Sequence, residues 1–110
     1  MAYLPQAGDL VWINFDPQIG REQAKNRPAL VMTSADFNAA TGLLLACPIT
    51  RTERPWRTRI PLADTETAGF IMIEQLKSLD WHARGAAFIE RLSKTLFDDV
   101  KSRIATMLDL

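Results

Sequence analysis

A charged loop contains the arginine that is best placed to hold a phosphate group. The loop opens at Gly20, runs through Glu22 and ends at Arg27, immediately before Pro28. Pro28 disfavours the helical conformation at Arg27, so we expect the arginine in extended backbone beside a strand. A guanidinium held in this way can bind a phosphoryl group through two parallel hydrogen bonds. The alternative is an arginine that only pairs with Glu22.

A hydroxyl and a second guanidinium follow an apolar stretch of the chain. Thr50 and Arg51 come directly after residues 43–49, whose apolar character predicts a central strand. At the end of a strand, a threonine hydroxyl and an arginine can donate hydrogen bonds to one phosphate. The alternative is a threonine that only caps the strand end.

The sequence gives less support to a cysteine nucleophile, a histidine general base or a metal site. Cys47 lies inside the apolar stretch, where a free cysteine usually packs as a small hydrophobic side chain. His82 is the only histidine and is a candidate general base, and the alternative is an ordinary surface or packing residue. No cluster of Cys, His, Asp and Glu has the spacing of a metal site, so we expect neither a metal nor another cofactor.

Composition and charge restrict the class of protein. The 110 residues carry 13 basic and 13 acidic groups and are 47% hydrophobic, which is typical of a single globular domain over residues 1–110. Most of the basic excess lies between residues 20 and 60, and it consists mainly of arginine. A neutral chain with a basic middle fits a phosphate ligand held at one place rather than bulk nucleic-acid binding. A single cysteine, with no signal peptide and no long apolar run, favours a cytoplasmic protein without a membrane span.

Hydrophobic patterns predict several short strands. We expect strands at residues 9–15, 29–33, 43–49, 57–62 and 70–73, a short element at 76–81, and a short helix over 34–40 that Ser34 caps. Within residues 57–62 the side chains alternate, so Arg57 and Arg59 are expected to form an arginine ladder on an open face.

The chain ends in a predicted amphipathic helix. Six apolar residues recur at helical spacing: Leu96, Phe97, Val100, Ile104, Met107 and Leu108. Thr95, with Asp98 three residues later, predicts the start of this helix. Strands followed by one such helix favour a small antiparallel sheet or barrel closed by a C-terminal helix.

The order of several motifs resembles the MazF/PemK/Kid family of toxins from toxin–antitoxin pairs. The matching segments are Gly8-Asp9-Leu10-Val11-Trp12, Asp16-Pro17, Gly20-x-Glu22-Gln23-x-x-x-Arg27-Pro28-Ala29, Pro48-Ile49-Thr50, Glu74-Gln75-Leu76-Lys77-Ser78-Leu79 and Ala83-Arg84-Gly85. The resemblance covers nearly the whole chain. It implies a mainly β fold with α: an SH3-like small antiparallel β-barrel with the C-terminal helix packed on it.

The resemblance also implies a metal-independent endoribonuclease that cleaves single-stranded RNA, usually messenger RNA, at a short sequence. Such enzymes use the 2′-hydroxyl of the RNA as nucleophile and leave a cyclic phosphate and a free 5′-hydroxyl. Arg27 matches the essential arginine of the family, and Thr50 matches its strand-end hydroxyl. Because guanidinium groups keep their proton in proteins, we assign Arg27 to electrostatic stabilisation of the non-bridging oxygens and Thr50 to positioning the same phosphate.

Two carboxylates are candidates for the general base. Glu22 is the nearest by sequence, and Glu74 matches a position that carries a carboxylate in parts of the family. In the branch that pairs an arginine with this second carboxylate, Met72 takes the place of the arginine here, which disfavours Glu74.

The candidate RNA-binding residues are polar or aromatic. They are Gln23, Lys25, Arg51, Arg54, Trp56, Arg57, Arg59, Glu74, Gln75, Lys77, Ser78 and Arg84. A flat ring among arginines suits single-stranded nucleic acid, although Trp56 has loop packing as an equal alternative.

The resemblance implies two protein partners. One is a second copy of the chain in a homodimer, to which Trp12, strand residues and part of the C-terminal helix are expected to contribute. The other is a cognate antitoxin with an acidic, partly disordered tail, which is expected to compete with RNA for the basic surface of residues 16–26 and 51–59.

Two other functions remain alternatives. One is a CcdB-like toxin that traps DNA gyrase and cuts no RNA, and the other is an RNA-binding module with an inactive site. The pairing of Arg27 with Thr50 has no purpose in the gyrase poison.

Overall fold

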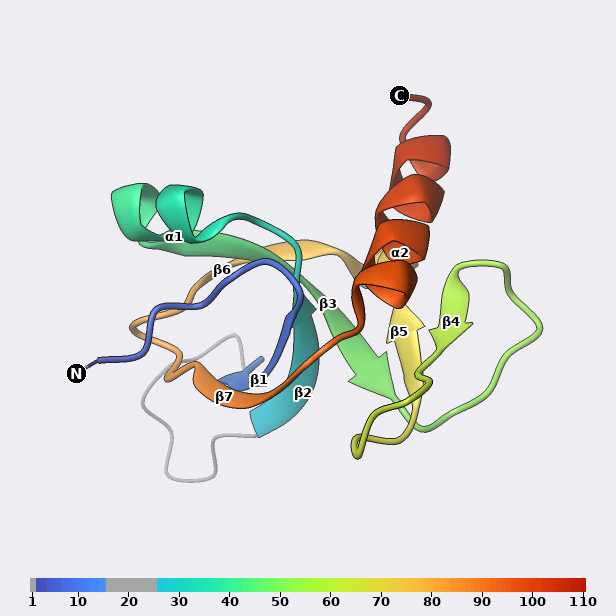
Figure 1. The fold of residues 1–110 in the computed structure, drawn as a ribbon, viewed down its shortest axis with the longest axis horizontal. Coiled ribbons are helices and arrows are strands. Elements are labelled where there is room, and N and C mark those ends of the chain that lie inside the picture. The colour runs from blue at the N-terminus through green and yellow to red at the C-terminus, as the bar shows by residue number, and fades with distance from the viewer. Residues whose placement is uncertain (1, 16–25) are drawn as a thin grey trace.

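Antiparallel strands build the sheet that carries the candidate phosphate-binding residues (Figure 1). Residues 2–15 and 26–110 are described by this computed structural model, and within them seven strands form one sheet. The strands are β1 (Asp9–Asn14), β2 (Asn26–Val31), β3 (Leu43–Thr50), β4 (Arg59–Pro61), β5 (Phe70–Met72), β6 (Lys77–Asp80) and β7 (Ala87–Arg91). One turn of 3₁₀ helix, η1 (Ile73–Gln75), connects β5 to β6.

Strand β3 lies at the centre of the sheet, as its apolar sequence predicts. The strand order is β4-β5-β3-β2-β1-β7, and β6 also pairs with β3. The first half of β3 pairs with β6, whereas its end, at Ile49 and Thr50, pairs with β5. This change of partner within one strand bends the sheet into a half-barrel, which remains open between β4 and β7 in the part of the chain that the structure describes.

The two faces of the sheet bury separate apolar clusters. One cluster contains Leu10, Leu30, Cys47 and Ile49 and packs against the C-terminal helix. The other cluster contains Val11, Ile13, Ala29, Val31, Leu44, Ala46 and Leu79. Successive residues of a strand point to opposite faces, so neighbouring positions of β1, β2 and β3 contribute to different clusters.

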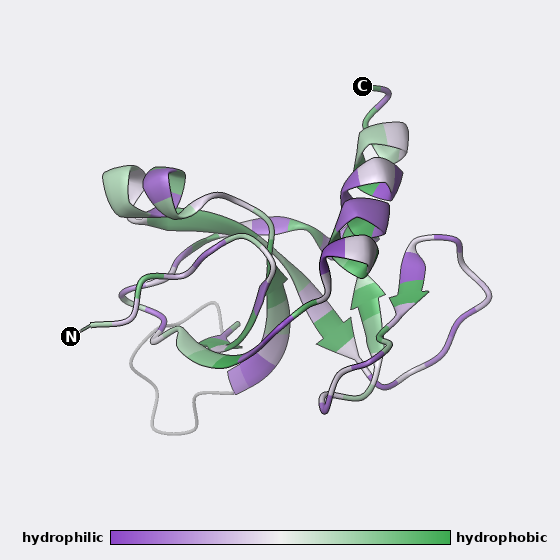
Figure 2. Ribbon diagram, in the orientation of Figure 1, coloured by the Kyte–Doolittle hydropathy of each residue, from purple (hydrophilic) through white to green (hydrophobic). Residues whose placement is uncertain are grey.

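Two helices flank the sheet, and each begins after a serine cap. Ser34 caps α1 (Ala35–Thr41) as predicted, and its hydroxyl accepts a hydrogen bond from the Phe37 amide. The predicted start of α2 (Lys94–Met107) is wrong, because Ser93 is the cap and accepts from the Leu96 amide. Thr95 therefore lies within the first turn. Both hydrophobic and hydrophilic residues run along α2, as an amphipathic helix requires (Figure 2).

Only the first part of the predicted apolar face of α2 is buried. Val100 is fully buried, and Leu96, Phe97 and Ile104 pack around the same cluster. Met107 and Leu108 are exposed at the end of the helix, which projects beyond the sheet in Figure 1. No helix of the described residues is long and apolar enough to cross a membrane.

The fold class is confirmed, and the differences concern element boundaries and one strand that was not predicted. Strand β2 begins at Asn26 and includes Pro28, three residues earlier than predicted, so Arg27 lies within a strand. Strand β4 covers only Arg59–Pro61. Strand β7 was not predicted. Its Phe88 is 52% exposed, so the positions of its hydrophobic residues do not indicate which face of the strand is buried.

Gly69 allows the β4–β5 loop to approach the end of β3. Its φ angle is 137°, and a Cβ added there would lie 2.5 Å from the carbonyl oxygen of Thr50. Only glycine fits this contact, because any side chain would collide with the backbone. The loop is thereby held against the strand end that carries Thr50.

Candidate functional site

Strand pairing brings Arg27 and Thr50 to the same place. In the β2–β3 ladder Ala29 lies opposite Pro48, and the same register continued by two residues places Arg27 opposite Thr50. Side chains directly opposite one another in an antiparallel pair share a face, with Cβ atoms about 5 Å apart. Arg27 is exposed and Thr50 is half-buried, so both are accessible to a ligand at these strand ends.

A lysine and an aromatic ring extend this face. Lys77 lies opposite Ala46 in the β3–β6 ladder, and its Nζ lies 5.5 Å from the centre of the Phe15 ring. Ala46 belongs to the same face of β3 as Thr50, since the two positions differ by an even number of residues. We call Arg27, Thr50 and Lys77 the phosphate face. Two exposed cations and a hydroxyl on one face form a surface suited to a phosphodiester.

Three predicted site residues lie outside the described residues. These are Glu22, Gln23 and Lys25, in the loop between β1 and β2. Their roles therefore stay predictions. Phe15, which precedes this loop, and Asn26, which follows it, bring the two ends of the loop next to the phosphate face.

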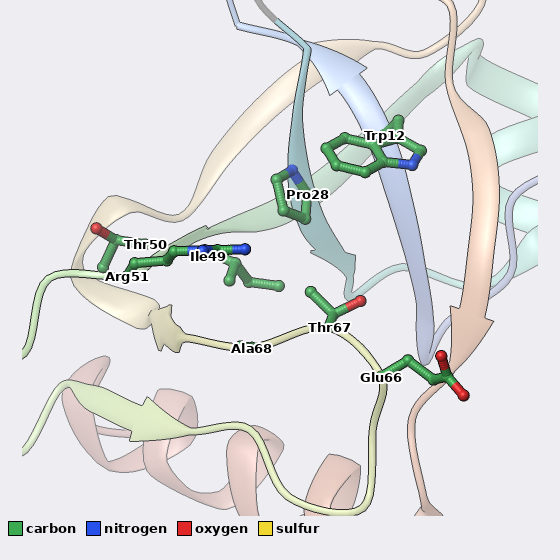
Figure 3. A pocket seen from close by; sticks show the side chains of 8 residues that line it. All are labelled: Trp12, Pro28, Ile49, Thr50, Arg51, Glu66, Thr67 and Ala68. Carbon is green, nitrogen blue, oxygen red and sulfur yellow. The ribbon is translucent and has the colours of Figure 1, made fainter.

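Arg51 comes directly after Thr50, the last residue of β3. It lines a cavity of about 480 Å³ together with Trp12, Pro28, Ile49, Thr50 and Thr67. Figure 3 shows the Arg51 side chain extending toward Pro28, whereas the side chain of Thr50 points away from Trp12. Thr50 and Arg51 thus share a cavity while their side chains extend in different directions, and the expectation that they hold one phosphate stays a prediction.

A carboxylate fixes the loop that forms one wall of this cavity. Glu90 of β7 accepts hydrogen bonds from the Glu66 amide at 3.0 Å, the Thr67 amide at 2.8 Å and the Thr67 hydroxyl at 2.7 Å. Partial burial acts to raise the pKa of Glu90, but these hydrogen bonds outweigh it and lower the pKa below the ordinary value. The loop is thus tied to β7 across the open side of the half-barrel.

The connection between β3 and β4 is the basic segment of the chain. Arg51, Arg54 and Arg57 are exposed, as is Trp56, with half of its surface accessible. The backbone carbonyl of Arg57 accepts a hydrogen bond from Arg103 of α2 at 3.3 Å. Exposed arginines thus accompany an exposed indole on this connection, and their contact with RNA stays a prediction.

Arg59 does not belong to an open arginine ladder. Its side chain is 10% exposed, and its Nε donates to Glu74 Oε2 at 3.1 Å. Its Nη1 donates to the Thr52 carbonyl at 3.0 Å, and its guanidinium carbon lies 4.7 Å from the centre of the Trp56 ring. The reason is that β4 is only three residues long and leaves Arg57 outside it, while Glu74 draws Arg59 inward.

No arginine was expected beside Glu74, because Met72 stands at the position where a branch of the family has one. An arginine nevertheless lies there, and it comes from β4. Arg59 lies opposite Met72 in the β4–β5 ladder, so β4 supplies a guanidinium where β5 has a methionine. The second oxygen of Glu74, Oε1, is buried and has no hydrogen-bond partner among the described residues. No spacing rule predicts this pair, because its members are fifteen residues apart and meet only through the register of β4 and β5.

The other predicted RNA-binding residues are distributed around this region. Gln75 and Ser78 are exposed, on η1 and β6 respectively. Arg84 is half-buried, and its Nη1 donates to the carbonyl of Asn14 at the end of β1. Arg84 thus supports the strand that leads into the β1–β2 loop.

The remaining reactive side chains are placed as packing residues. Cys47 is fully buried, and burial followed by the nearby charge of Glu74 raises the pKa of its thiol to about 12. His82 is exposed and packs edge-on against Trp81. Among the described residues no group of three or more His, Cys, Asp and Glu could hold a metal ion.

Comparisons with known proteins place the chain in a family. Residues 6–108 match the family of the PemK-like, MazF-like toxin of type II toxin–antitoxin systems. The endoribonuclease toxin MazF of Escherichia coli K12 is 34% identical over 106 residues, which cover 96% of both chains. The endoribonuclease PemK of Escherichia coli is 31% identical over 108 residues, covering 94% of this chain and 81% of PemK.

A solved structure agrees with these relatives. The crystal structure of a MazE–MazF complex from Deinococcus radiodurans matches with a TM-score of 0.89 and 34% identity, over 99% of each chain. The family and the enzyme class predicted from the sequence are thereby confirmed. The chain belongs to the PemK-like, MazF-like toxin family of type II toxin–antitoxin systems, and it is an endoribonuclease toxin of that family.

Proposed function

We propose that this chain cleaves single-stranded RNA at a short sequence, without a metal ion, by attack of the RNA's own 2′-hydroxyl. The observation that carries the proposal is the β2–β3 register, which, continued two residues beyond Ala29 and Pro48, brings Arg27 opposite Thr50 at the accessible ends of the two strands. This arrangement supplies positive charge and a hydrogen bond to a phosphate, and we assign the Thr50 hydroxyl to that hydrogen bond rather than to nucleophilic attack. The nucleophile of the proposed reaction is then the 2′-hydroxyl that RNA contains.

The proposed step transfers the phosphoryl group within the RNA. The 2′-oxygen forms a bond to the adjacent phosphorus while the bond from phosphorus to the 5′-oxygen breaks, which leaves a 2′,3′-cyclic phosphate and a 5′-hydroxyl. Arg27 stabilises the negative charge that grows on the non-bridging oxygens, and Thr50 orients the phosphate. A general base takes the 2′-hydroxyl proton, and a general acid protonates the leaving 5′-oxygen.

Glu22 is the base that we favour. Glu74 is the alternative, but one of its oxygens pairs with Arg59 and the other is buried. A carboxylate held in this way is poorly placed to accept a proton from a bound substrate. Glu22 belongs to the loop whose two ends lie beside the phosphate face.

We further propose which residues bind the RNA on either side of the scissile phosphate. Lys77 belongs to the phosphate face, and Arg51, Arg54 and Arg57 are exposed on the β3–β4 connection. The other candidates are Gln23, Lys25, Trp56, Gln75, Ser78 and Arg84. Glu74 and Arg59 leave the set of direct contacts because they bind each other.

The proposed partners are a second copy of the chain and an antitoxin. The Deinococcus MazF relative was crystallised with MazE, which supports an antitoxin of that type for this chain. We propose that its acidic tail competes with RNA for the exposed arginines, and that the protein acts as a homodimer in the cytoplasm. RNA that fails to displace the tail, or a monomer by light scattering at micromolar concentration, would contradict these assignments.

Cleavage in the presence of a chelator tests the central proposal. The pure protein is incubated with a long single-stranded RNA and excess chelator, and the products are sequenced from both ends. We expect fragments that share a short sequence at the cut and carry a cyclic phosphate and a 5′-hydroxyl. Intact RNA under these conditions would instead favour a toxin that acts by binding, such as a gyrase poison.

A further inference from the structure

The guanidinium of Arg59 connects three parts of the molecule. It donates to Glu74 Oε2 at 3.1 Å and to the Thr52 carbonyl at 3.0 Å, and it lies over the ring of Trp56. Thr52 and Trp56 bracket most of the exposed connection between β3 and β4. With a side chain that is only 10% exposed, Arg59 is the internal support of this connection.

The same network reaches the hydroxyl of Thr50. The amide of Thr52 donates to Thr50 Oγ1 at 3.1 Å, so the residue that Arg59 holds through its carbonyl also holds the Thr50 side chain through its amide. A hydroxyl has one proton and two acceptor lone pairs. Since the Thr52 amide uses one lone pair, the proton of Thr50 stays available to donate to a phosphate oxygen.

The charge of Glu74 explains why Arg59 stays in this position. Glu74 Oε2 pairs with Arg59, while Oε1 is buried without a hydrogen-bond partner among the described residues. A half-buried carboxylate with one buried, unsatisfied oxygen depends on its counter-ion, because leaving the charge unpaired is costly. The position of Arg59 is thus fixed from the side of the core.

We propose that Arg59, anchored by Glu74, is a positioning residue for RNA cleavage: it orients the Thr50 hydroxyl through Thr52 and fixes Trp56 and the neighbouring arginines. This inference rests on the proposed function. It assigns Arg59 no contact with the substrate, in contrast to the exposed arginines of the same connection. Small displacements of a positioning group can cost up to about 10²-fold in rate.

Substitution of Arg59 by lysine tests the proposal without removing the positive charge. Lysine lacks the planar fork that reaches Glu74 and the Thr52 carbonyl together. We expect Arg59→Lys to lower kcat for RNA cleavage by on the order of 10-fold to 10²-fold, with little change in KM. The salt dependence of RNA binding should stay the same, since the number of phosphate contacts does not change.

Arg91 provides a matched control. Its Nη1 also pairs with a carboxylate, Asp9 at 2.9 Å, and its Nη2 donates to a backbone carbonyl, that of Ala7. It lies on β7, away from the β3–β4 connection. We expect Arg91→Lys to leave kcat within about two-fold of the wild-type value.

A double-mutant cycle tests whether Arg59 acts on kcat through Thr50, and a ¹⁹F NMR spectrum tests whether Arg59 fixes Trp56. If Arg59 acts through Thr50, adding Arg59→Lys to Thr50→Ala should lower kcat much less than it does in the wild-type background. In protein labelled with 5-fluorotryptophan, the ¹⁹F resonance of Trp56, assigned with Trp56→Phe, should move in Arg59→Lys, while those of Trp12 and Trp81 stay in place.

Several results would overturn the inference. Wild-type kcat in Arg59→Lys, or strictly additive effects with Thr50→Ala, would show that Arg59 does not position the hydroxyl. In Arg59→Gln, which removes the charge, a salt slope that falls by about 0.7 would mean that Arg59 itself contacts a phosphate. An unmoved Trp56 resonance would exclude the stacked contact. Failure of the wild-type protein to cleave any RNA would overturn the proposed function itself, and is thus a distinct outcome.

Discussion

Arg27→Ala is expected to abolish most RNA cleavage while leaving the protein folded. Arg27 is exposed on β2, and the apolar clusters are formed by its neighbours Ala29, Leu30 and Val31, so its removal leaves no cavity. Loss of one donor to a charge that develops in the transition state costs on the order of 10²–10³ in rate. Cleavage of a fluorescent RNA oligonucleotide at saturating substrate measures this loss.

Two controls accompany this measurement. Far-UV circular dichroism and the thermal midpoint should match those of the wild-type protein, because the substituted side chain is not part of the core. Arg27→Lys keeps the charge but loses the planar fork, so it should bind RNA nearly as well and still cleave slowly. Wild-type rates in both variants would remove Arg27 from the mechanism and leave Thr50 without a partner.

The strands beside this arginine could be predicted where apolar residues lie close together in the sequence. In β1, Leu10, Val11 and Ile13 are all fully buried, yet they divide between two clusters on opposite faces. The apolar β3 is buried on both faces, which made its central place predictable. Ser34 could be identified as a cap because a short polar side chain before a helix has few other roles.

Strand β7 shows where pattern reasoning fails. It is a terminal strand of the sheet and carries an exposed Phe88 beside a half-buried Ile89. The Phe88 ring packs against Tyr3, which comes from the N-terminal segment. Hydrophobic residues that contact loops rather than the sheet core do not follow the period of two, so the segment has no clear strand signal.

The candidate site could be predicted where its residues lie at the ends of recognisable segments. It could not be predicted where strand pairing brings together residues that are distant in the sequence. Arg27 could be identified because it ends the charged loop, and Thr50 because it follows the apolar stretch. Both residues also match motifs of the family. The pairing of Arg59 with Glu74 depends on a ladder of three residue pairs between β4 and β5, with Arg59 opposite Met72. A one-residue change of that register would turn Arg59 to the other face, so no reading of local spacing finds the pair.

The placement of Thr50 and Arg51 shows the same limit at closer range. Both follow the apolar run and were expected to share a phosphate. Both line the cavity beside Trp12, but Thr50 ends β3 whereas Arg51 lies beyond it, and their side chains extend in different directions (Figure 3). Local spacing alone therefore does not decide whether the two groups reach one phosphate.

Replacement of one ribose by deoxyribose at the scissile position is expected to abolish cleavage altogether. The described residues around Arg27 and Thr50 contribute charge and hydrogen bonds, and the only thiol, that of Cys47, is buried with its pKa raised. In the proposed reaction the substrate's 2′-hydroxyl is the nucleophile, and none of these described residues is assigned to replace it. The cut site is first mapped on RNA, and cleavage of the matched oligonucleotides is then followed by electrophoresis.

Measurements of RNA binding distinguish a loss of the cleavage step from a loss of affinity. The oligonucleotide with one deoxyribose keeps all of its phosphates, so its Kd and the salt dependence of Kd should equal those of the all-RNA substrate. A second oligonucleotide with the deoxyribose one nucleotide downstream should be cut at nearly the normal rate. If the scissile deoxyribose substrate were cut normally, the attacking group would have to be water or a side chain. Arg27 and Thr50 would then act on a hydrolytic reaction rather than on a transfer within the RNA.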